Sequence, residues 1–331
     1  MSSPTTDLPD APSTSGHVGP VVILAGGLSH ERDVSLRSGR RVADALREAG
    51  IEVHVHDVDA DLLRFLAESR PSLVWPVLHG ASGEDGSLQD VLALTGLPTV
   101  GTGPRESRQA WTKPVAKAEL LTAGLHTPDY VTLPQALFRD LGAQSVLDLI
   151  EDRLGLPLVV KPVRGGSALG VTRVERSADF PRAMVDCFAY GDTALIERAV
   201  DGVELAVSVV DGPEGLEALP PVEIVTDGAY DYDARYNPGP VEYFTPARLD
   251  PSDAAAVSDV AVRAHLALGL KHLSRTDIIL DSAGVPWVLE VNVAPGMTET
   301  SLLPQAAVAA GYQLPALYRR IVEHAAVSAR N

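Results

Sequence analysis

The sequence predicts an α/β protein with more than one domain, and three observations support this. The chain has 331 residues, which exceeds what one hydrophobic core usually organises and suggests two or three domains. An apolar run that ends in paired glycines, VVILAGG at 21–27, is typical of a buried parallel strand. Helix-like and strand-like segments then alternate, which is the pattern of βαβ units.

A first α/β domain is expected over about 19–112. After the first strand, residues 35–50 have the apolar spacing of a helix and end in glycine. The next segments read as strand, strand and helix, in the order IEVHVHDVD, SLVWPVLHG, SLQDVLALTG. Residues 1–18 are rich in Ser, Thr, Pro and Asp and are expected to be a disordered tail, because they lack the basic start and apolar core of a signal peptide.

Two further regions are expected to follow, over 113–197 and 198–331. The first should hold a helix at 111–124 and three strands, LPLVVKPV, VTRVE and ALIERAV. The second should hold four strands and two helices, with the segments LAVSVV, PPVEIV, DIILD, WVLEVN, SDAAAVSDVAVRAHLALG and LPALYRRIVEHAAVSAR.

Composition excludes several classes of function. The formal net charge is −17, which disfavours binding a nucleic acid over a broad face. No apolar run reaches the roughly 18 residues that cross a bilayer. One cysteine, Cys187, excludes an intramolecular disulfide and fits a reducing cytoplasm. Its apolar neighbours favour a small core residue over a nucleophile.

A candidate metal site lies at the end of the apolar strand WVLEVN. Glu290 and Asn292 are two residues apart, so on a strand their side chains face the same way. Asp277, on another expected strand, adds a second carboxylate, and hard oxygen ligands of this kind suit Mg²⁺. Arg275 should share the face of Asp277 and can neutralise a transferring phosphoryl group. The alternative is a set of surface residues at a strand end.

Two other segments have the chemistry of a nucleotide site. Lys161 ends an apolar strand before the glycine-rich RGGSALG, whose backbone N–H groups can close over phosphates. A simple glycine hairpin is the alternative. Glu197 and Glu204 flank an Asp-Gly turn, where a carboxylate can bind ribose hydroxyls, or where the chain can form an exposed hairpin.

Polar residues that can bind a small substrate follow the first and third strands. Glu31 can hold an ammonium group, or can simply be favoured near a helix N-terminus by the helix dipole. His79 and Glu84 can be site residues or ordinary loop residues. Near the C-terminal end, PGMTETSLLP supplies Gly296, Thr298, Thr300 and Ser301 in a turn before a helix, which can bind a carboxylate.

Taken in order, these segments resemble the D-alanine–D-alanine ligases of the ATP-grasp superfamily from about residue 20 to 325. The motifs that carry the resemblance are GGLSHERDVSLRSG, LHGASGEDGSLQ, LVVKPVRGGSALGV, YDYDARY, SRTDIILD and LEVNVAPGMTETSL. The resemblance implies a three-domain ATP-grasp fold with a Rossmann-like N-terminal domain. It also implies a cytoplasmic enzyme, commonly a homodimer, that uses ATP and Mg²⁺ (or Mn²⁺) to make D-alanyl-D-alanine for peptidoglycan.

The resemblance also assigns roles to residues of the substrate side. Glu31 matches the glutamate that binds the ammonium group of the first D-alanine, and His79 matches the histidine after the third strand. Ser301 and Leu302 match the residues near the carboxylate of the second D-alanine. Gly296 matches the tight turn of the oxyanion site.

On the nucleotide side, Lys113 and Lys161 match the two lysines, and Glu204 matches the acidic residue on the ribose. Glu197 falls at the start of the adenine-contacting linker. The metal ligands match Asp277, Glu290 and Asn292, and the phosphoryl-stabilising arginine matches Arg275. Ser167 and Tyr236 match the serine and tyrosine that close the site together with Glu31.

The chain departs from the family pattern at three positions. The loop that usually reads Glu-Gly-Ser-Ser has Gly165 and Ala168 at its ends, and the lysine before the mobile tyrosine is Arg235. Arginine keeps the charge but not the shape of lysine, so contact with the γ-phosphate can persist with altered geometry. Acceptor choice therefore stays open, as do two alternatives: a specialised amino-acid ligase and a non-catalytic nucleotide-binding relative.

Overall fold

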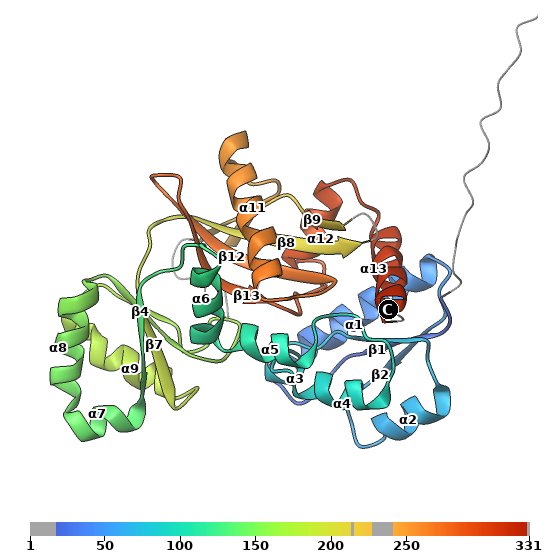
Figure 1. Ribbon diagram of the computed structural model, residues 1–331, viewed down its shortest axis with the longest axis horizontal. Coiled ribbons are helices and arrows are strands. Elements are labelled where there is room, and N and C mark those ends of the chain that lie inside the picture. Colours follow the sequence, from blue (N-terminus) through green and yellow to red (C-terminus); the bar gives the residue numbers. More distant parts are fainter. Residues whose placement is uncertain (1–17, 213–214, 227–240, 330–331) are drawn as a thin grey trace, which may run out of the picture.

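The computed structural model describes residues 18–212, 215–226 and 241–329 and contains three sheets, each flanked by helices (Figure 1). The expected disordered tail falls outside the described residues except for Val18. Within the described ranges, no helix has both the length and the apolar character needed to cross a membrane.

The first sheet is parallel, with β1 (Val21–Leu24) between β2 (Val53–His56) and β3 (Leu73–Pro76). All four residues of β1 are buried because both faces of the sheet are covered. One face packs on α1 (Arg32–Glu48), and the other on α2 (Leu62–Ser69) and α4 (Ser87–Thr95). The short α3 (Ala81–Glu84) precedes α4. The prediction of a buried parallel strand is confirmed.

The second sheet is antiparallel and has the order β4-β7-β5-β6. Its strands and helices are β4 (Tyr130–Pro134), α7 (Gln135–Leu141), α8 (Ala143–Leu154), β5 (Leu158–Pro162), β6 (Thr172–Val174), α9 (Phe180–Phe188) and β7 (Thr193–Arg198), with a 3₁₀ turn at Ser177–Asp179. Cys187 lies on the buried side of α9, where burial raises the pKa of its thiol to about 12. Its prediction as a core residue is confirmed.

The third sheet has the order β11-β10-β8-β12-β13, and β9 pairs with β8. Its strands are β8 (Gly202–Gly212), β9 (Gly215–Ala218), β10 (Val222–Thr226), β11 (Val241–Phe244), β12 (Leu273–Asp281) and β13 (Pro286–Asn292). Helix α11 (Pro251–Ala267) covers one face, and α12 (Leu302–Ala309) and α13 (Leu314–Ser328) cover the other.

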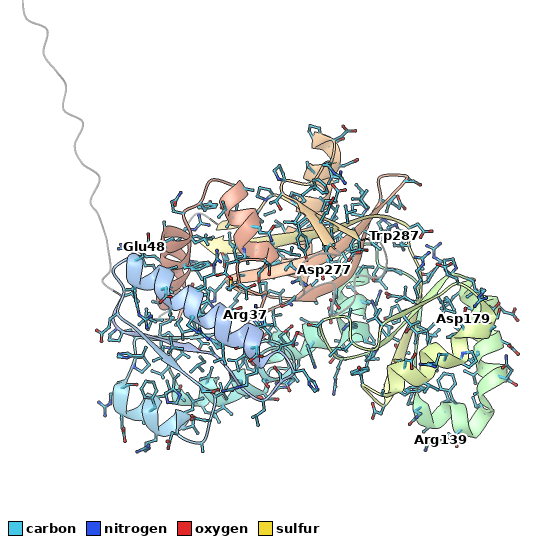
Figure 2. The ribbon with its side chains drawn as sticks, turned by 180° about the vertical axis from the view of Figure 1, so that it is seen from behind. Arg37, Glu48, Arg139, Asp179, Asp277 and Trp287 are labelled. Carbon is cyan, nitrogen blue, oxygen red and sulfur yellow. The ribbon has the colours of Figure 1, made fainter. Side chains whose placement is uncertain are left out.

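A continuous core joins the first and third sheets, because Ile23 of β1 and Leu46 of α1 belong to the same buried cluster as Val210 of β8 and Ile321 of α13. The second sheet forms a separate lobe with its own core (Figure 1). Seen from behind, Asp277 of the third sheet lies between the first sheet's α1 and that lobe, which carries Asp179 (Figure 2). The functional residues of all three parts therefore converge near the middle of the molecule.

The helix expected at 111–124 is confirmed, although it begins two residues later, and a helix that was not expected ends directly before it. Helix α5 (Pro104–Trp111) ends before α6 (Lys113–Thr122), and Thr112 between them is extended (φ −94°, ψ 92°). Pro114 explains the break, since proline is tolerated in the first turn of a helix but clashes with the preceding turn inside one. As a result, α6 starts at Lys113.

Candidate active site

Strands β12 and β13 place four polar residues on one face. Arg275 lies opposite Asn292, and Asp277 lies opposite Glu290. Because residues two positions apart on a strand share a face, all four side chains project from the same side of the sheet. The guanidinium of Arg275 donates two hydrogen bonds to Asp277, at 2.7 Å from Nε and 2.9 Å from Nη2. The common face expected from the spacing is thus present, and one of its carboxylates is paired with the arginine.

Lys113 connects this face to the glycine loop, residues 163–171. Its Nζ donates to the carbonyl of Gly165 at 2.7 Å and lies 3.3 Å from Oε2 of Glu290. Asn292 Oδ1 accepts the backbone N–H of Ala294 at 2.8 Å. Lys113, at the start of α6, therefore contacts both the glycine loop and the carboxylate of Glu290 on β13.

The oxygen donors of Asp277, Glu290 and Asn292 are of the type that Mg²⁺ prefers. They include only two carboxylates, and among the residues that the structure describes no group of three or more His, Cys, Asp or Glu side chains is arranged to hold a metal ion. The fit to Mg²⁺ therefore rests on a mixed donor set of carboxylates and an amide beside the two cationic side chains Lys113 and Arg275.

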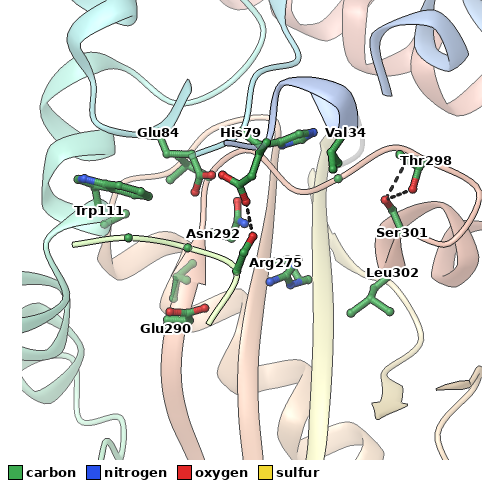
Figure 3. A pocket seen from close by; sticks show the side chains of 18 of the residues that line it. Val34, His79, Glu84, Trp111, Arg275, Glu290, Asn292, Thr298, Ser301 and Leu302 are labelled. Carbon is green, nitrogen blue, oxygen red and sulfur yellow. Dashed lines mark hydrogen bonds between the residues drawn. The ribbon is translucent and has the colours of Figure 1, made fainter. Parts of the chain in front are cut away.

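A pocket opens above this face and takes residues from all three parts of the chain (Figure 3). Arg275, Glu290 and Asn292 line it from the third sheet, and Thr298, Ser301 and Leu302 line it on another side. We call this the substrate-side pocket. Its lining also includes Glu31, His79, Glu84, Lys113, Ser167 and Gly296.

Glu31 and Ser167 join the first part of the chain to the glycine loop. Glu31 occupies the N-cap position of α1 and is buried, although its side chain makes no capping hydrogen bond to the helix. Instead, its Oε1 accepts a hydrogen bond from the hydroxyl of Ser167. Ser167 and Ala168 both have positive φ (54° and 56°), which turns the loop sharply at this contact. A favourable interaction of Glu31 with the dipole of α1 would not by itself explain the contact with Ser167.

His79 and Glu84 are buried in the wall of the substrate-side pocket rather than exposed in a loop. His79 Nδ1 lies 3.0 Å from the carbonyl of Ala294, and Nε2 lies 3.2 Å from Ser38 Oγ. Burial lowers the pKa of His79. Burial, reinforced by the charge of Glu31, raises the pKa of Glu84 to about 8.

Gly296 forms a turn that leaves no room for a side chain. A Cβ atom at this position would lie 2.6 Å from Ser301 Oγ. Ser301 precedes α12, and its Oγ accepts the backbone N–H of Thr298 at 2.9 Å (Figure 3). The close approach keeps the hydroxyls of Thr298 and Ser301 together at the pocket wall.

A second pocket lies between the second and third sheets and is lined by Lys161, Glu197 and Glu204. It shares Lys113, Gly165, Gly166 and Glu290 with the substrate-side pocket. We call it the nucleotide-side pocket. The two pockets therefore meet at the polar face of β12 and β13.

The hairpin alternatives have different outcomes. The exposed hairpin at Glu197 and Glu204 is wrong, because β7 and β8 belong to different sheets and Glu197 is only 2% exposed. The glycine hairpin is present, since β5 and β6 pair antiparallel around residues 163–171. That same hairpin loop lines both pockets, so the structural and functional interpretations are compatible.

Glu197 lies between two lysines. Its Oε1 is 2.5 Å from Lys161 Nζ, and its Oε2 is 2.8 Å from Lys117 Nζ. Burial opposes ionisation of Glu197, but the charges of the two lysines outweigh it and lower its pKa. The sequence analysis missed Lys117, although its position four residues after Lys113 on a helix places both on one side. Two expected site residues, Arg235 and Tyr236, lie outside the described residues.

Together, the three sheets and the adjoining pockets define an ATP-grasp protein, which confirms the predicted fold class. The family described as D-ala D-ala ligase C-terminus matches residues 120–323. A D-alanine–D-alanine ligase of Bordetella petrii is 42% identical over 325 residues, covering 98% of this chain and 96% of the relative. One from Anaeromyxobacter dehalogenans is 41% identical over 310 residues, covering 93% and 97%.

Solved structures give the same result. The D-alanine–D-alanine ligase of Bacillus anthracis complexed with ATP has a TM-score of 0.79 at 27% identity, covering 94% of this chain and 99% of that one. The VanG D-Ala:D-Ser ligase of Enterococcus faecalis has a TM-score of 0.80 at 25% identity, covering 93% and 99%. The chain belongs to the D-alanine–D-alanine ligase family.

Proposed function

We propose that the protein joins two D-alanines into D-alanyl-D-alanine at the expense of ATP, for peptidoglycan precursor synthesis. The observation that carries the proposal is the meeting of two pockets at Lys113 and Glu290 in a chain of this family. The carboxylate of the first D-alanine attacks the γ-phosphorus of ATP, which gives an acyl phosphate and ADP. The amine of the second D-alanine then attacks the acyl carbon, and phosphate leaves as the peptide bond forms.

In the substrate-side pocket, we assign Glu31 to the ammonium group of the first D-alanine. Its buried carboxylate, held by Ser167, supports this role. Ser301 and Leu302, at the start of α12, are assigned to the carboxylate of the second D-alanine, and Gly296 to the oxyanion site. Arg275 supplies positive charge where negative charge develops in the transition state. His79 holds the wall of the pocket through Ala294.

In the nucleotide-side pocket, Lys113 and Lys161 are assigned to phosphate oxygens, and Glu204 to the ribose hydroxyls. Glu204 lines the pocket from β8, opposite Ile279 of the neighbouring strand β12. Glu197 is assigned to the start of the adenine linker, and its buried carboxylate also pairs with Lys161. Positioning and charge neutralisation supply most of the catalysis in phosphoryl transfer.

Asp277, Glu290 and Asn292 are the residues that would hold Mg²⁺, and Mn²⁺ accepts the same oxygen donors. When bound, the divalent ion supplies neutralisation of phosphate charge. Arg275 and Lys113, which contact Asp277 and Glu290 here, supply positive charge on the same face. These two cationic side chains support a site that binds phosphate groups together with a divalent ion.

We also assign Arg235 to the γ-phosphate and Tyr236 to closure of the site with Ser167 and Glu31. We propose a cytoplasmic homodimer; the buried free thiol of Cys187 supports a reducing compartment. One observation favours a different acceptor as a second candidate: the glycine loop has Gly165 and Ala168 where the family has a carboxylate and a hydroxyl. Gly165 lines both pockets and Ala168 lines the nucleotide-side pocket, which supports an effect on substrate choice or rate.

The test is phosphate release from ATP and Mg²⁺ by the purified protein, with D-alanine, other D- and L-amino acids and D-lactate, and with the product mass measured. Release that requires D-alanine and yields D-alanyl-D-alanine is the expected result. Release only with another acceptor would replace the proposed substrate, and absence of turnover despite ATP binding would favour a non-catalytic relative.

A further inference from the structure

Lys117 is a buried cation that does not line either pocket. It lies on α6, is 1% exposed, and its Nζ contacts Oε2 of Glu197 at 2.8 Å. It also donates to the hydroxyl of Thr127 and to the carbonyl of Pro128, the latter at 3.4 Å, and lies 5.2 Å from the ring centroid of Tyr130. These contacts are all with protein groups, and Lys117 is absent from the lining of both pockets among the residues that the structure describes.

Burying such a charge is costly unless it is paired and hydrogen-bonded. A methionine of similar length would fill the same space without that cost, so stability alone gives little reason for an ion here. The second carboxylate oxygen of Glu197, Oε1, connects Lys117 to the nucleotide-side pocket. It lies 2.5 Å from Nζ of Lys161, which faces the nucleotide-side pocket. Lys117, Glu197 and Lys161 therefore form a row from α6 to the pocket.

The row limits how Glu197 can pair with Lys161. Because Lys117 occupies Oε2, Glu197 presents only Oε1 to Lys161. Without Lys117, both oxygens of Glu197 are free to pair with Lys161, and the lysine is drawn away from an incoming phosphate. Helix α6 also carries Lys113 one turn earlier, which contacts Gly165 and Glu290. Helix α6 thereby contacts Glu290 through Lys113 and reaches Lys161 through Lys117 and Glu197.

We propose that Lys117 is a positioning residue of the ATP site, which acts by holding one oxygen of Glu197 so that Lys161 stays available to the phosphates. The inference rests on the proposed nucleotide-side pocket, but not on which amino acid is the acceptor. It can therefore be tested by ATP binding alone.

Protonation of Lys117 gives an independent signature. Burial lowers the pKa of Lys117 to about 8, while the charges of Glu197 and Asp129 oppose the decrease and that of Lys161 adds to it. Tyr130 also faces the ammonium group. As pH rises through about 8, Lys117 loses its charge and its hold on Glu197. The affinity for ATP should then fall in the parent protein and not in a variant that lacks the amine.

The decisive variant is Lys117→Met, measured by direct titration of ATP and by the KM values for ATP and D-alanine. We expect the Kd and KM for ATP to rise about tenfold, corresponding to about 1.4 kcal/mol, with less than about a twofold change in KM for D-alanine. In the Glu197→Gln background, Lys117→Met should change ATP affinity by less than about twofold, because a residue that acts through Glu197 has no further effect once that carboxylate is gone.

Two controls separate positioning from general loss of structure. Thr127→Val removes the hydroxyl contact of Lys117 but leaves its pair with Glu197, so it should lower the unfolding temperature with little change in ATP affinity. Lys271→Met makes the same chemical change at an exposed lysine and should alter neither. Equal loss of ATP affinity in Thr127→Val and Lys117→Met would overturn the proposal in favour of a purely structural role.

The remaining outcomes also test the proposed role of Lys117. Unchanged ATP affinity in Lys117→Met, or fully additive losses with Glu197→Gln, would overturn the proposal. If Lys117→Met does not fold, the parent protein titrated with ATP between pH 7 and 9.5 gives the answer, since a constant Kd across that range contradicts it. A parent that binds ATP without D-alanine turnover would count against the proposed function and leave this inference standing.

Discussion

The two adjoining pockets are built in different ways. In the nucleotide-side pocket, Lys161 lies on β5 and Glu197 on β7, and the two side chains form an ion pair. In the substrate-side pocket, residues such as Glu31, His79 and Ser301 lie at element ends and in loops. The ion pair of the first pocket thus joins two neighbouring strands of one sheet, whereas the second pocket depends on how three parts of the chain meet.

The largest effect is expected where the two pockets join. Glu290→Gln removes a proposed metal ligand and the charge near Lys113, so kcat should fall by about a thousandfold, which corresponds to roughly 4 kcal/mol of transition-state stabilisation. The unfolding temperature should change little because Glu290 is partly exposed. Steady-state kinetics and thermal unfolding measure the two effects, with Glu68→Gln on the exposed side of α2 as the control. Full activity in Glu290→Gln would exclude this residue from the metal site.

The substrate-side pocket should make the protein less stable as pH rises. Because burial raises the pKa of Glu84 to about 8 from an ordinary value of 4.5, the folded state binds more protons than the unfolded state between these values. The stabilisation is fully present below about pH 4.5 and is lost as pH rises toward 8, by about 1.4 kcal/mol per pH unit at most.

Denaturant unfolding of the parent protein and Glu84→Gln at pH 5 and pH 7.5 measures this loss. The parent should lose on the order of 3 kcal/mol relative to the variant over that range. A constant difference between the two proteins would show that Glu84 ionises with an ordinary pKa. Glu68→Gln, at an exposed position, serves as the control.

The closure that we propose for the substrate-side pocket depends on the hydrogen bond between Ser167 and Glu31. Ser167→Ala removes the hydroxyl, and kcat should fall by about tenfold to thirtyfold because a hydrogen bond to a charged group contributes roughly 1.5–2 kcal/mol. The KM for ATP should change less. Ser145→Ala changes an exposed serine of α8 in the same lobe and should leave kcat unchanged. A drop in ATP affinity as large as the drop in kcat would contradict an effect confined to the substrate side.

The smallest effect is expected at the turn before α12. Gly296→Ala places a methyl group 2.6 Å from Ser301 Oγ, so the serine must shift. We expect KM for D-alanine to rise about fivefold, corresponding to roughly 1 kcal/mol, without a change in ATP binding. Gly191→Ala is the matched control, because its Cβ would meet only Pro162 at an ordinary 3.8 Å. An unchanged KM would show that the turn adapts freely.

Much of the polar face could be predicted because it depends on short spacing within strands. The alternation of Arg275 with Asp277, and of Glu290 with Asn292, follows from strand geometry alone. The cross-strand register that places Asp277 opposite Glu290 does not, since it depends on a pairing between separate segments. Likewise, the bidentate contact between Arg275 and Asp277 requires side-chain conformations that spacing cannot specify.

Lys117 illustrates what local patterns miss. Its partner Glu197 is 80 positions away along the chain, and nothing near Lys117 indicates that an ammonium group will be buried there. Helices α7, α8 and α9 were also missed, because their segments are short and partly polar and are held in place by packing on the second sheet. The domain boundaries at 112 and 197, drawn from sequence, remain predictions.

The most direct test of the account is the reaction itself, followed as D-alanine-dependent phosphate release from ATP with mass identification of the product. The account predicts one phosphate for each D-alanyl-D-alanine formed, a requirement for a divalent ion, and loss of both products in Glu290→Gln. Phosphate release that does not depend on D-alanine, or a D-alanine-dependent product other than the dipeptide, would contradict it.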